Sequence, residues 1–299
     1  MKQTYESKTF RADTQALIDQ ANTIINEYQA DGYELTLRQL YYQFVARDLI
    51  ENSQRSYKRL GKVISNARMA GLIDWEAIVD RTRNLHTNSH WSGVNEILKS
   101  AADSFRRDLW EGQEYAVEVW IEKEALIGVI EGPCVELDIP YFACRGYVSQ
   151  SEQWRAGERV MDRWHTDHQK TIILHLGDHD PSGVDMTRDN QDRIDLFSDY
   201  ESIVTVRRIA LNWEQVQEYN PPPNPTKLTD TRAGDYIKRY GMNSWELDAL
   251  EPRLIDRLIR GVVDEYIDHE IMSAVKARQE SERRQLQTLA KESVRAAKD

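Results

Sequence analysis

The sequence predicts a mixed α/β fold, in which a helical N-terminal domain precedes an α/β domain with a largely parallel sheet. Three observations support this. The first part of the chain carries capped segments with helical spacing, the second alternates apolar β-branched runs with helical segments, and basic residues concentrate in the first. The 299 residues are enough for two domains, which we place at residues 1–112 and 113–299.

The N-terminal domain opens with two helices that the sequence delimits well. Residues 12–30 carry apolar side chains three and four positions apart, and Asp31 and Gly32 end that helix. A second helix should start at Thr36, because Thr36 and Gln39 have the Thr-x-x-Gln form of a capping box.

A third helix, over residues 57–69, lies in the most basic part of the chain. Three short helices in such a stretch suggest a helix-turn-helix or winged-helix unit whose third helix faces DNA. Its candidate DNA-binding residues are Arg55, Lys58, Arg59 and Lys62. The alternative is a basic helix that faces solvent in a generic bundle. A further helix over residues 92–110 links the two domains.

Charge is distributed unevenly along the chain. The total is −11, yet Leu35–Arg107 contains 12 Lys and Arg against 7 Asp and Glu, a net charge of +5, which leaves −16 for the remainder. A basic segment joined to an acidic body fits a DNA-reading part attached to a metal-holding part. Ordinary variation of surface charge explains the same numbers, and charge alone does not separate the two readings.

The C-terminal domain alternates strands and helices. We expect strands at 115–121, 140–144, 171–176 and 203–209, and helices at 125–137, 151–165, 185–196, 245–266 and 274–299. Pro221–Pro225 forms a stiff loop. This alternation is typical of a parallel sheet covered by helices.

Acidic residues follow two of these strands. Asp178 and Asp180 come directly after the apolar run 171–176, and Glu122 ends the first strand. In open parallel sheets, sites lie at the carboxyl ends of strands, and carboxylates this close favour a cation such as Mg²⁺ between them. We expect Pro181 and Gly183 to form a turn that holds the aspartates.

Simpler readings exist for the acidic residues. A lone Asp-x-Asp is often a turn cap, and the acids could form structural salt bridges. The added glutamate favours metal binding. The competing acids Glu118, within the strand, and Glu124, at the start of a helix, are expected to be structural.

Cysteine content and hydropathy exclude two classes of protein. The chain has only Cys134 and Cys144, which make neither a disulfide scaffold nor a close metal-type pair. No apolar run approaches the length of a membrane span, and no secretory signal follows Met1. We therefore expect a cytoplasmic protein that does not insert into membranes.

The segment from Glu122 to Gly183 resembles the Toprim domain of topoisomerases, primases and related nucleases. Asp178–Gly183 looks more specifically like the A subunit of type IIB topoisomerase (topoisomerase VI) and its meiotic break-making relatives, and Ile121–Leu126 is similar to the glutamate motif of that group. The resemblance implies a Mg²⁺ site made by Glu122, Asp178 and Asp180.

Leu37–Tyr42 also resembles this group, which carries an arginine and then, four residues later, the nucleophilic tyrosine. The resemblance implies that Tyr42 is the nucleophile. Arg38 shares its helix face and can grip the phosphate that Tyr42 attacks. Gln39 departs from the acid that relatives often carry. Without the other motifs, Tyr41 and Tyr42 would be read as core aromatics.

The similarity extends to Trp245–Leu250, which looks like a late segment of the family, and covers most of the chain from Leu35 to Tyr266. Arg145, after the second strand, is a candidate DNA contact or an ordinary surface arginine. The chain resembles the compact, stand-alone versions of the A subunit, with a winged-helix-like domain that carries the tyrosine and a Toprim-like domain with a helical C-terminal extension.

The activity that this resemblance implies is cleavage and rejoining of double-stranded DNA through a covalent phosphotyrosine. It further implies a homodimer and, for strand passage, a separate ATPase subunit. Two alternatives stay open: a Toprim nuclease that uses metal-activated water, and a non-catalytic DNA-binding component of a larger assembly.

Overall fold

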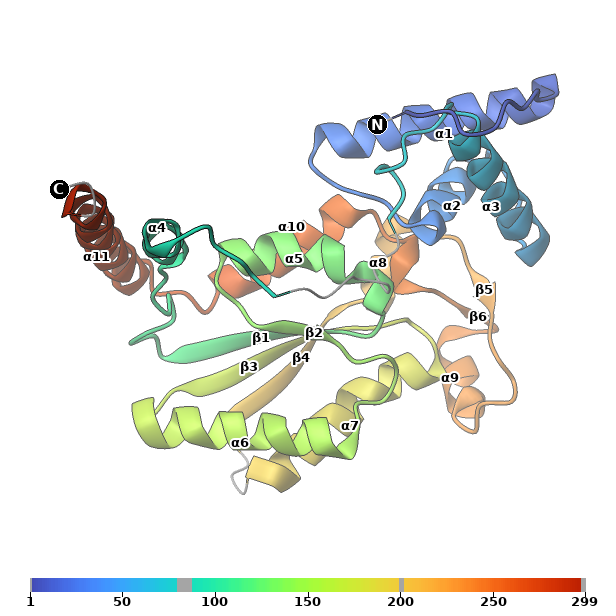
Figure 1. The fold of residues 1–299 in the computed structure, drawn as a ribbon. Helices are drawn as coiled ribbons and strands as arrows, with labels where there is room; N and C mark the ends of the chain where they lie inside the picture. The colour runs from blue at the N-terminus through green and yellow to red at the C-terminus, as the bar shows by residue number, and fades with distance from the viewer. Residues whose placement is uncertain (1, 80–87, 199–201, 297–299) are drawn as a thin grey trace.

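The computed structural model describes residues 2–79, 88–198 and 202–296, and it shows N-terminal helices followed by a four-stranded, all-parallel sheet with flanking helices (Figure 1). The helices are α1 (Ala12–Ala30), α2 (Leu37–Ala46), α3 (Gln54–Met69), α4 (Val94–Ser104), α5 (Ile127–Glu136), α6 (Gln150–Asp167), α7 (Pro181–Ser198), α8 (Trp213–Tyr219), α9 (Ala233–Tyr240), α10 (Pro252–Asp264) and α11 (His269–Ala296). The strands are β1 (Tyr115–Ile121), β2 (Tyr141–Ala143), β3 (Lys170–Leu176), β4 (Val204–Ala210), β5 (Asn224–Pro225) and β6 (Asn243–Ser244), with short 3₁₀ helices η1 (Glu124–Leu126) and η2 (Leu247–Ala249).

Helices α1, α2 and α3 pack around a core of their own, which includes the fully buried Ile18, Leu40 and Phe44. The predicted capping box of α2 is confirmed, since Thr36 Oγ1 accepts from the Gln39 amide and the Gln39 side chain accepts from the Thr36 amide. Helix α3 begins earlier than predicted, because Ser53 caps it by accepting from the Ser56 amide.

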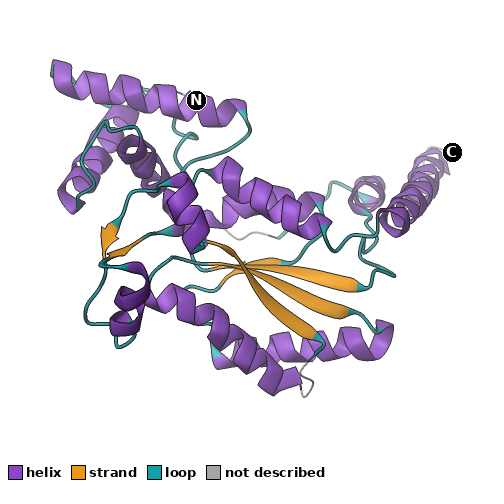
Figure 2. Cartoon of the chain, turned by 180° about the vertical axis from the view of Figure 1, so that it is seen from behind, coloured by secondary structure: helices purple, strands orange, loops and turns teal. Residues whose placement is uncertain are grey.

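The main sheet has the strand order β2-β1-β3-β4, so β1 and β3 are central and adjacent. Their register pairs Val119 with Leu174 and Ile121 with Leu176, which ends both strands at the same level. Helices α5 and α10 cover one face and α6 and α7 the other (Figures 1 and 2). The β1 and β3 side chains are buried after the first residue of each strand, as expected of a parallel sheet covered on both faces.

Two predicted helices are wrong in extent. The helix expected over residues 92–110 stops at Ser104, since Phe105 is extended and the Arg107 amide donates to Gln279 Oε1 of α11. The helix expected over residues 245–266 is two pieces, η2 and α10, because Pro252 occupies the first turn of α10 and cannot continue a helix from before it. The chain between them is extended at Leu250 and Glu251.

Helices α8 and α9 and the strands β5 and β6 were not predicted, whereas the remaining helices and strands lie close to their predicted ranges. The proline-rich loop contains the short strand β5, which pairs antiparallel with β6. Helices α4 and α11 lie side by side beyond the sheet domain (Figures 1 and 2). Across the part of the chain that the structure describes, no helix has the length and apolar character needed to cross a membrane.

Candidate functional site

The candidate site lies where β1 and β3 end, and the parallel register brings their acids together. The Asp178 amide donates to Glu122 Oε2 over 2.8 Å, while the Glu122 amide donates to the Leu176 carbonyl. The fit around Gly177 is tight, because a Cβ there would lie 3.0 Å from Glu122 Oε2. The predicted meeting of Glu122 and Asp178 is therefore seen in the structure.

Asp180, predicted as a metal ligand, also has a structural role. Its Oδ1 accepts from the Gly183 amide at 2.6 Å and from Ser182 Oγ at 2.9 Å, which makes it the cap of α7. The turn expected at residues 181–183 is instead the first turn of that helix, with Pro181 at its start, where proline is well tolerated. Gly183 is needed here, since a Cβ would lie 2.2 Å from the Asp178 carbonyl oxygen.

Arg208 of β4 binds the backbone of the loop after β3. Its guanidinium donates to the carbonyl oxygens of Asp178 at 2.6 Å and Gly177 at 2.9 Å, and to Gly183 O at 2.8 Å. Arg208 was not predicted from the sequence as a site residue. The available signal was an arginine pair inside an otherwise apolar strand.

His179, between the two aspartates in sequence, has its side chain in an aromatic cluster. Its Nδ1 lies 2.7 Å from the Tyr236 hydroxyl, and its ring packs among Trp213, Tyr240 and Trp245. The His179 backbone also exchanges two hydrogen bonds with Trp245. This aromatic cluster ties the loop after β3 to the segment that carries Glu246 and Asp248.

Lys123 is the cation at the centre of the site. Its Nζ lies 2.6 Å from Asp248 Oδ1, 2.9 Å from Glu246 Oε2 and 3.0 Å from Asp178 Oδ1. Burial alone would lower the pKa of Lys123, but the surrounding carboxylates raise it. Lys123 therefore remains charged.

Two of the acids that contact Lys123, Asp178 and Glu246, have pKa values shifted in opposite directions. Burial raises the pKa of Asp178 to about 7, with Glu122 and Asp248 adding to the effect and Lys123 opposing it. Burial also acts to raise the pKa of Glu246, but Lys123 and Arg38 outweigh it and lower that pKa to about 2. Burial likewise raises the pKa of Glu122. Negative charge is thus costly at the strand ends and well compensated at Glu246.

Arg38 joins this site from α2. Its Nε lies 2.9 Å from Asp248 Oδ2, it also pairs with Glu246, and its guanidinium carbon lies 5.9 Å from the centre of the Tyr42 ring. The predicted pairing of Arg38 and Tyr42 on one helix face is seen in the structure. Glu246 and Asp248, which connect them to Lys123, were not predicted as site residues.

Tyr42 is 3% exposed and borders a cavity of about 460 Å³. Arg38, Asn52, Asn224 and Glu246 line the same cavity. Burial raises the pKa of Tyr42 to about 12, and the negative charges of Asp248 and Glu246 contribute. The phenol is therefore protonated and needs added positive charge before it can act as a nucleophile.

Tyr41 differs from its neighbour. Its hydroxyl donates to Asn52 Oδ1 at 2.9 Å and contacts the Ser53 carbonyl, and its ring packs edge-on against Tyr57. Tyr41 thus has the structural role that the core-aromatic reading proposed for both tyrosines.

The competing acids are engaged elsewhere. The buried Glu118 carboxylate forms ion pairs with Arg159 and Arg163 and accepts a hydrogen bond from the Trp120 indole nitrogen. Glu124 pairs with Arg145, whose backbone amide donates to the Glu122 carbonyl at 2.9 Å. Arg145 is exposed beside the acidic edge.

The candidate DNA-binding residues of α3 lie on one helix face. Arg55, Lys58, Arg59 and Lys62 are all exposed, at positions three and four apart. Arg59 pairs with Asp13 of α1 at 3.2 Å.

The three predicted metal ligands do not form a ready-made cage. In the described ranges, no three His, Cys, Asp or Glu side chains are arranged to hold a metal ion. Each acid still keeps one oxygen, namely Glu122 Oε1, Asp178 Oδ2 and Asp180 Oδ2, that no described residue contacts by a hydrogen bond or ion pair. Mg²⁺ is usually held by one or two carboxylates together with substrate phosphate and water, so this donor set fits it.

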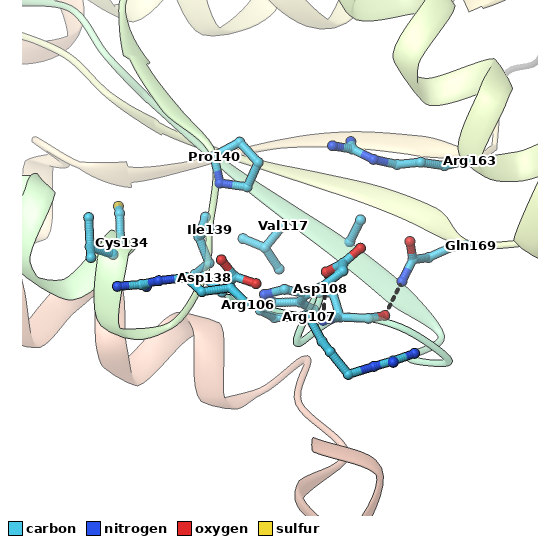
Figure 3. Close-up of a pocket in the computed structure, with 13 residues that line it drawn as sticks. Arg106, Arg107, Asp108, Val117, Cys134, Asp138, Ile139, Pro140, Arg163 and Gln169 are labelled. Carbon is cyan, nitrogen blue, oxygen red and sulfur yellow. Dashed lines mark hydrogen bonds between the residues drawn. The ribbon is translucent and has the colours of Figure 1, made fainter. Parts of the chain in front are cut away.

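A second cavity, of about 540 Å³, lies at the amino ends of β1 and β3 (Figure 3). Among its lining residues, Arg107 pairs with Glu111 and Glu282, and Arg163 pairs with Glu118. It is at the opposite end of the strands from the acids and is not part of the candidate site.

No protein-family model matches the chain, and no curated protein matches it either.

Proposed function

We propose that the protein cleaves and rejoins double-stranded DNA by a tyrosine transesterification, with Tyr42 as the nucleophile. One observation carries this proposal. An unbroken series of charged contacts runs from Arg38, beside Tyr42, through Glu246 and Asp248 to Lys123, and from Lys123 to Asp178 at the acidic edge. We infer that the tyrosine and the acids belong to one site, although they are far apart in the sequence.

The finer fold assignments belong to the same proposal. Helices α1 to α3 would be a winged-helix-like unit that presents the exposed basic face of α3 to DNA. The α/β domain would be Toprim-like, because its acids follow two neighbouring parallel strands. The type IIB topoisomerase A subunit, in a compact form, is the family that this arrangement resembles.

In the proposed reaction, Tyr42 Oη forms a bond to phosphorus as the bond from phosphorus to the 3′ oxygen breaks. The phenol proton passes to solvent and the 3′ oxygen takes up a proton, so no oxidant or energy source is consumed. Arg38 would bind the phosphate and lower the cost of the phenolate. The ester bond to Tyr42 preserves the phosphodiester energy, which allows the 3′ hydroxyl to attack and reseal the strand.

Glu122, Asp178 and Asp180 would hold Mg²⁺ through the oxygens to which no residue in the described ranges forms a hydrogen bond or ion pair. When bound, such an ion supplies positive charge beside the phosphate and the leaving oxygen. Lys123 holds Asp178 and thereby orients the acidic edge. From the family resemblance we further propose a homodimer that cuts both strands and a separate ATPase subunit for strand passage.

The test is covalent trapping. Protein, supercoiled DNA and Mg²⁺ are mixed, stopped with detergent and run on a gel with and without protease, for the wild type and Tyr42→Phe. We expect linear DNA whose migration depends on protease, and its loss in Tyr42→Phe. Cleavage that persists in Tyr42→Phe would exclude Tyr42 as the nucleophile.

The burial of Tyr42 and its raised pKa favour a second candidate, a nuclease that uses water at the acidic edge. That enzyme would lose activity in Asp178→Asn but keep it in Tyr42→Phe. Its products would carry no protein. The same gel therefore separates the two functions.

A further inference from the structure

Asp248 is a buried carboxylate that contacts a cation from each of the two domains. Its side chain is 1% exposed. Oδ1 lies 2.6 Å from Lys123 Nζ, which follows β1, and Oδ2 lies 2.9 Å from Arg38 Nε, which belongs to α2. Asp248 therefore links the helix that carries Tyr42 to the strand end that carries Glu122, as Glu246 also does through the same two cations.

The backbone around Asp248 is fixed independently of these ion pairs. Pro252 starts α10 and keeps the preceding residues out of that helix, so Leu247–Ala249 forms a separate 3₁₀ turn. The Leu247 amide donates to Asp178 Oδ1 at 2.7 Å. Trp245 exchanges backbone hydrogen bonds of 2.8 and 2.9 Å with His179. These contacts fix the position of Asp248 relative to the loop that carries Asp178.

The two cations have different surroundings. Lys123 has three carboxylate partners, so Asp248 is one of several groups that hold it. Arg38 is 45% exposed and is paired only with Glu246 and Asp248 among the described residues. Without Asp248, Arg38 would keep a single, more exposed partner and could turn away from the Tyr42 ring. Arg38 thus depends on two carboxylates, the hydrogen-bonded Glu246 and the more deeply buried Asp248.

We propose that Asp248 is a positioning residue, which holds Arg38 against Tyr42 and aligns this pair with the acidic edge through Lys123. It touches no substrate in this role and acts through the two cations. The inference rests on the proposed function, because the alignment matters only if Tyr42 and the acids act on one phosphate. Misplacing a catalytic group by about 1 Å costs on the order of 100-fold in rate.

The first experiment does not depend on catalysis. Urea unfolding is measured for Arg38→Gln, Asp248→Asn and the double variant. If the residues were independent, their effects on the unfolding equilibrium constant would multiply. We expect the double variant to unfold at least about tenfold less readily than that product, since the pair is lost only once. Effects that multiply would overturn the proposal whether or not the protein cuts DNA.

The second experiment measures covalent adduct formation in a single turnover, as a function of DNA concentration. We expect Asp248→Asn to lower the maximal rate about 100-fold while the half-saturating DNA concentration changes less than about threefold. Asp248→Glu, which keeps the charge, should recover part of the rate. The matched control is Glu251→Gln, an exposed acid three residues away, which should behave as the wild type.

The two experiments distinguish the failure of each proposal. Coupling without a rate defect in Asp248→Asn would make Asp248 a purely stabilising residue and would leave the proposed function standing. If the wild type and Tyr42→Phe form no adduct or cleave alike, the proposed function is overturned, and the unfolding cycle alone decides whether Asp248 links the two domains.

Discussion

Two buried carboxylates in this protein, Glu118 and Asp248, are each held by two cations, yet they hold different things together. Glu118 lies in β1. It forms ion pairs with Arg159 and Arg163, both from α6, and accepts a hydrogen bond from the Trp120 indole. Glu118 and Trp120 are two residues apart in β1, and both arginines come from the helix that covers that side of the sheet. The cluster therefore fastens a helix to the strand beneath it.

Asp248 receives its cations from parts of the chain that are far apart in sequence. Arg38 comes from α2 and Lys123 from the residue after Glu122. The comparison teaches that burial and ion pairing do not by themselves mark a functional residue. What separates the two acids is the origin of their partners, because Asp248, together with Glu246, connects the tyrosine helix to the acidic strand ends, whereas Glu118 does not.

The largest effect on stability should come from Glu118. We expect Glu118→Gln to lower the free energy of unfolding by about 3–5 kcal/mol, because it leaves two arginines without their buried partner. Urea unfolding at pH 7 measures this. Adduct formation per folded molecule should be unchanged, in contrast to Asp248→Asn.

The control for this prediction is Glu152→Gln. Glu152 also pairs with Arg159 at 3.3 Å, but its side chain is 32% exposed. We expect Glu152→Gln to lower the free energy of unfolding by less than about 1 kcal/mol. If Glu118→Gln were as mild as Glu152→Gln, the description of Glu118 as the buried anchor of α6 would be wrong.

A smaller effect of opposite sign is expected at Asp178. Its pKa in the folded protein is raised from 3.8 to about 7, so the unfolded chain loses this proton at lower pH than the folded chain. Folding is therefore penalised increasingly as the pH rises from about 4 to 7, and fully above 7. Asp178→Asn removes that penalty along with one partner of Lys123, and should stabilise the protein by about 1–2 kcal/mol at pH 8.

Unfolding curves at pH 4.5, 6 and 8 check both the sign and the window. The gain should shrink as the pH falls toward 4, because the penalty on folding the wild type is then mostly gone. Millimolar Mg²⁺ should narrow the gap at pH 8, because an ion bound at Glu122 and Asp178 stabilises only the wild type. A gain that does not change with pH would contradict the raised pKa.

Much of the acidic edge could be predicted from sequence, because it depends on local rules. Parallel strands that are neighbours place their carboxyl ends together, so Glu122 and Asp178 could be paired before the fold was known. The capping box at Thr36 depends on residues three apart and was predicted for the same reason. The order of the strands, which makes β1 and β3 adjacent, was not predicted and is known only from the structure.

The rest of the site depends on contacts between distant segments. Lys123 and Asp248 are 125 residues apart, and nothing local indicates that they meet. Helical spacing predicted one helix through residues 245–266, which would have placed Asp248 on a helix surface. Pro252 was the available warning, and its effect on the segment before it was missed.

The smallest effect on stability should come from the basic face of α3, whose charges are neither buried nor shared with the site. We expect the triple variant Arg55→Gln, Lys58→Gln, Lys62→Gln to change the free energy of unfolding by less than about 0.5 kcal/mol per residue. If this face contacts phosphates, the slope of log affinity against log salt should decrease by about 2–3, measured by fluorescence anisotropy with duplex DNA. The matched control, Lys276→Gln, Arg284→Gln, Lys291→Gln on α11, removes the same charge from another exposed surface. Equal losses of affinity would mean that net charge drives binding, whereas a loss confined to the α3 variant would locate the DNA on the same domain as Tyr42.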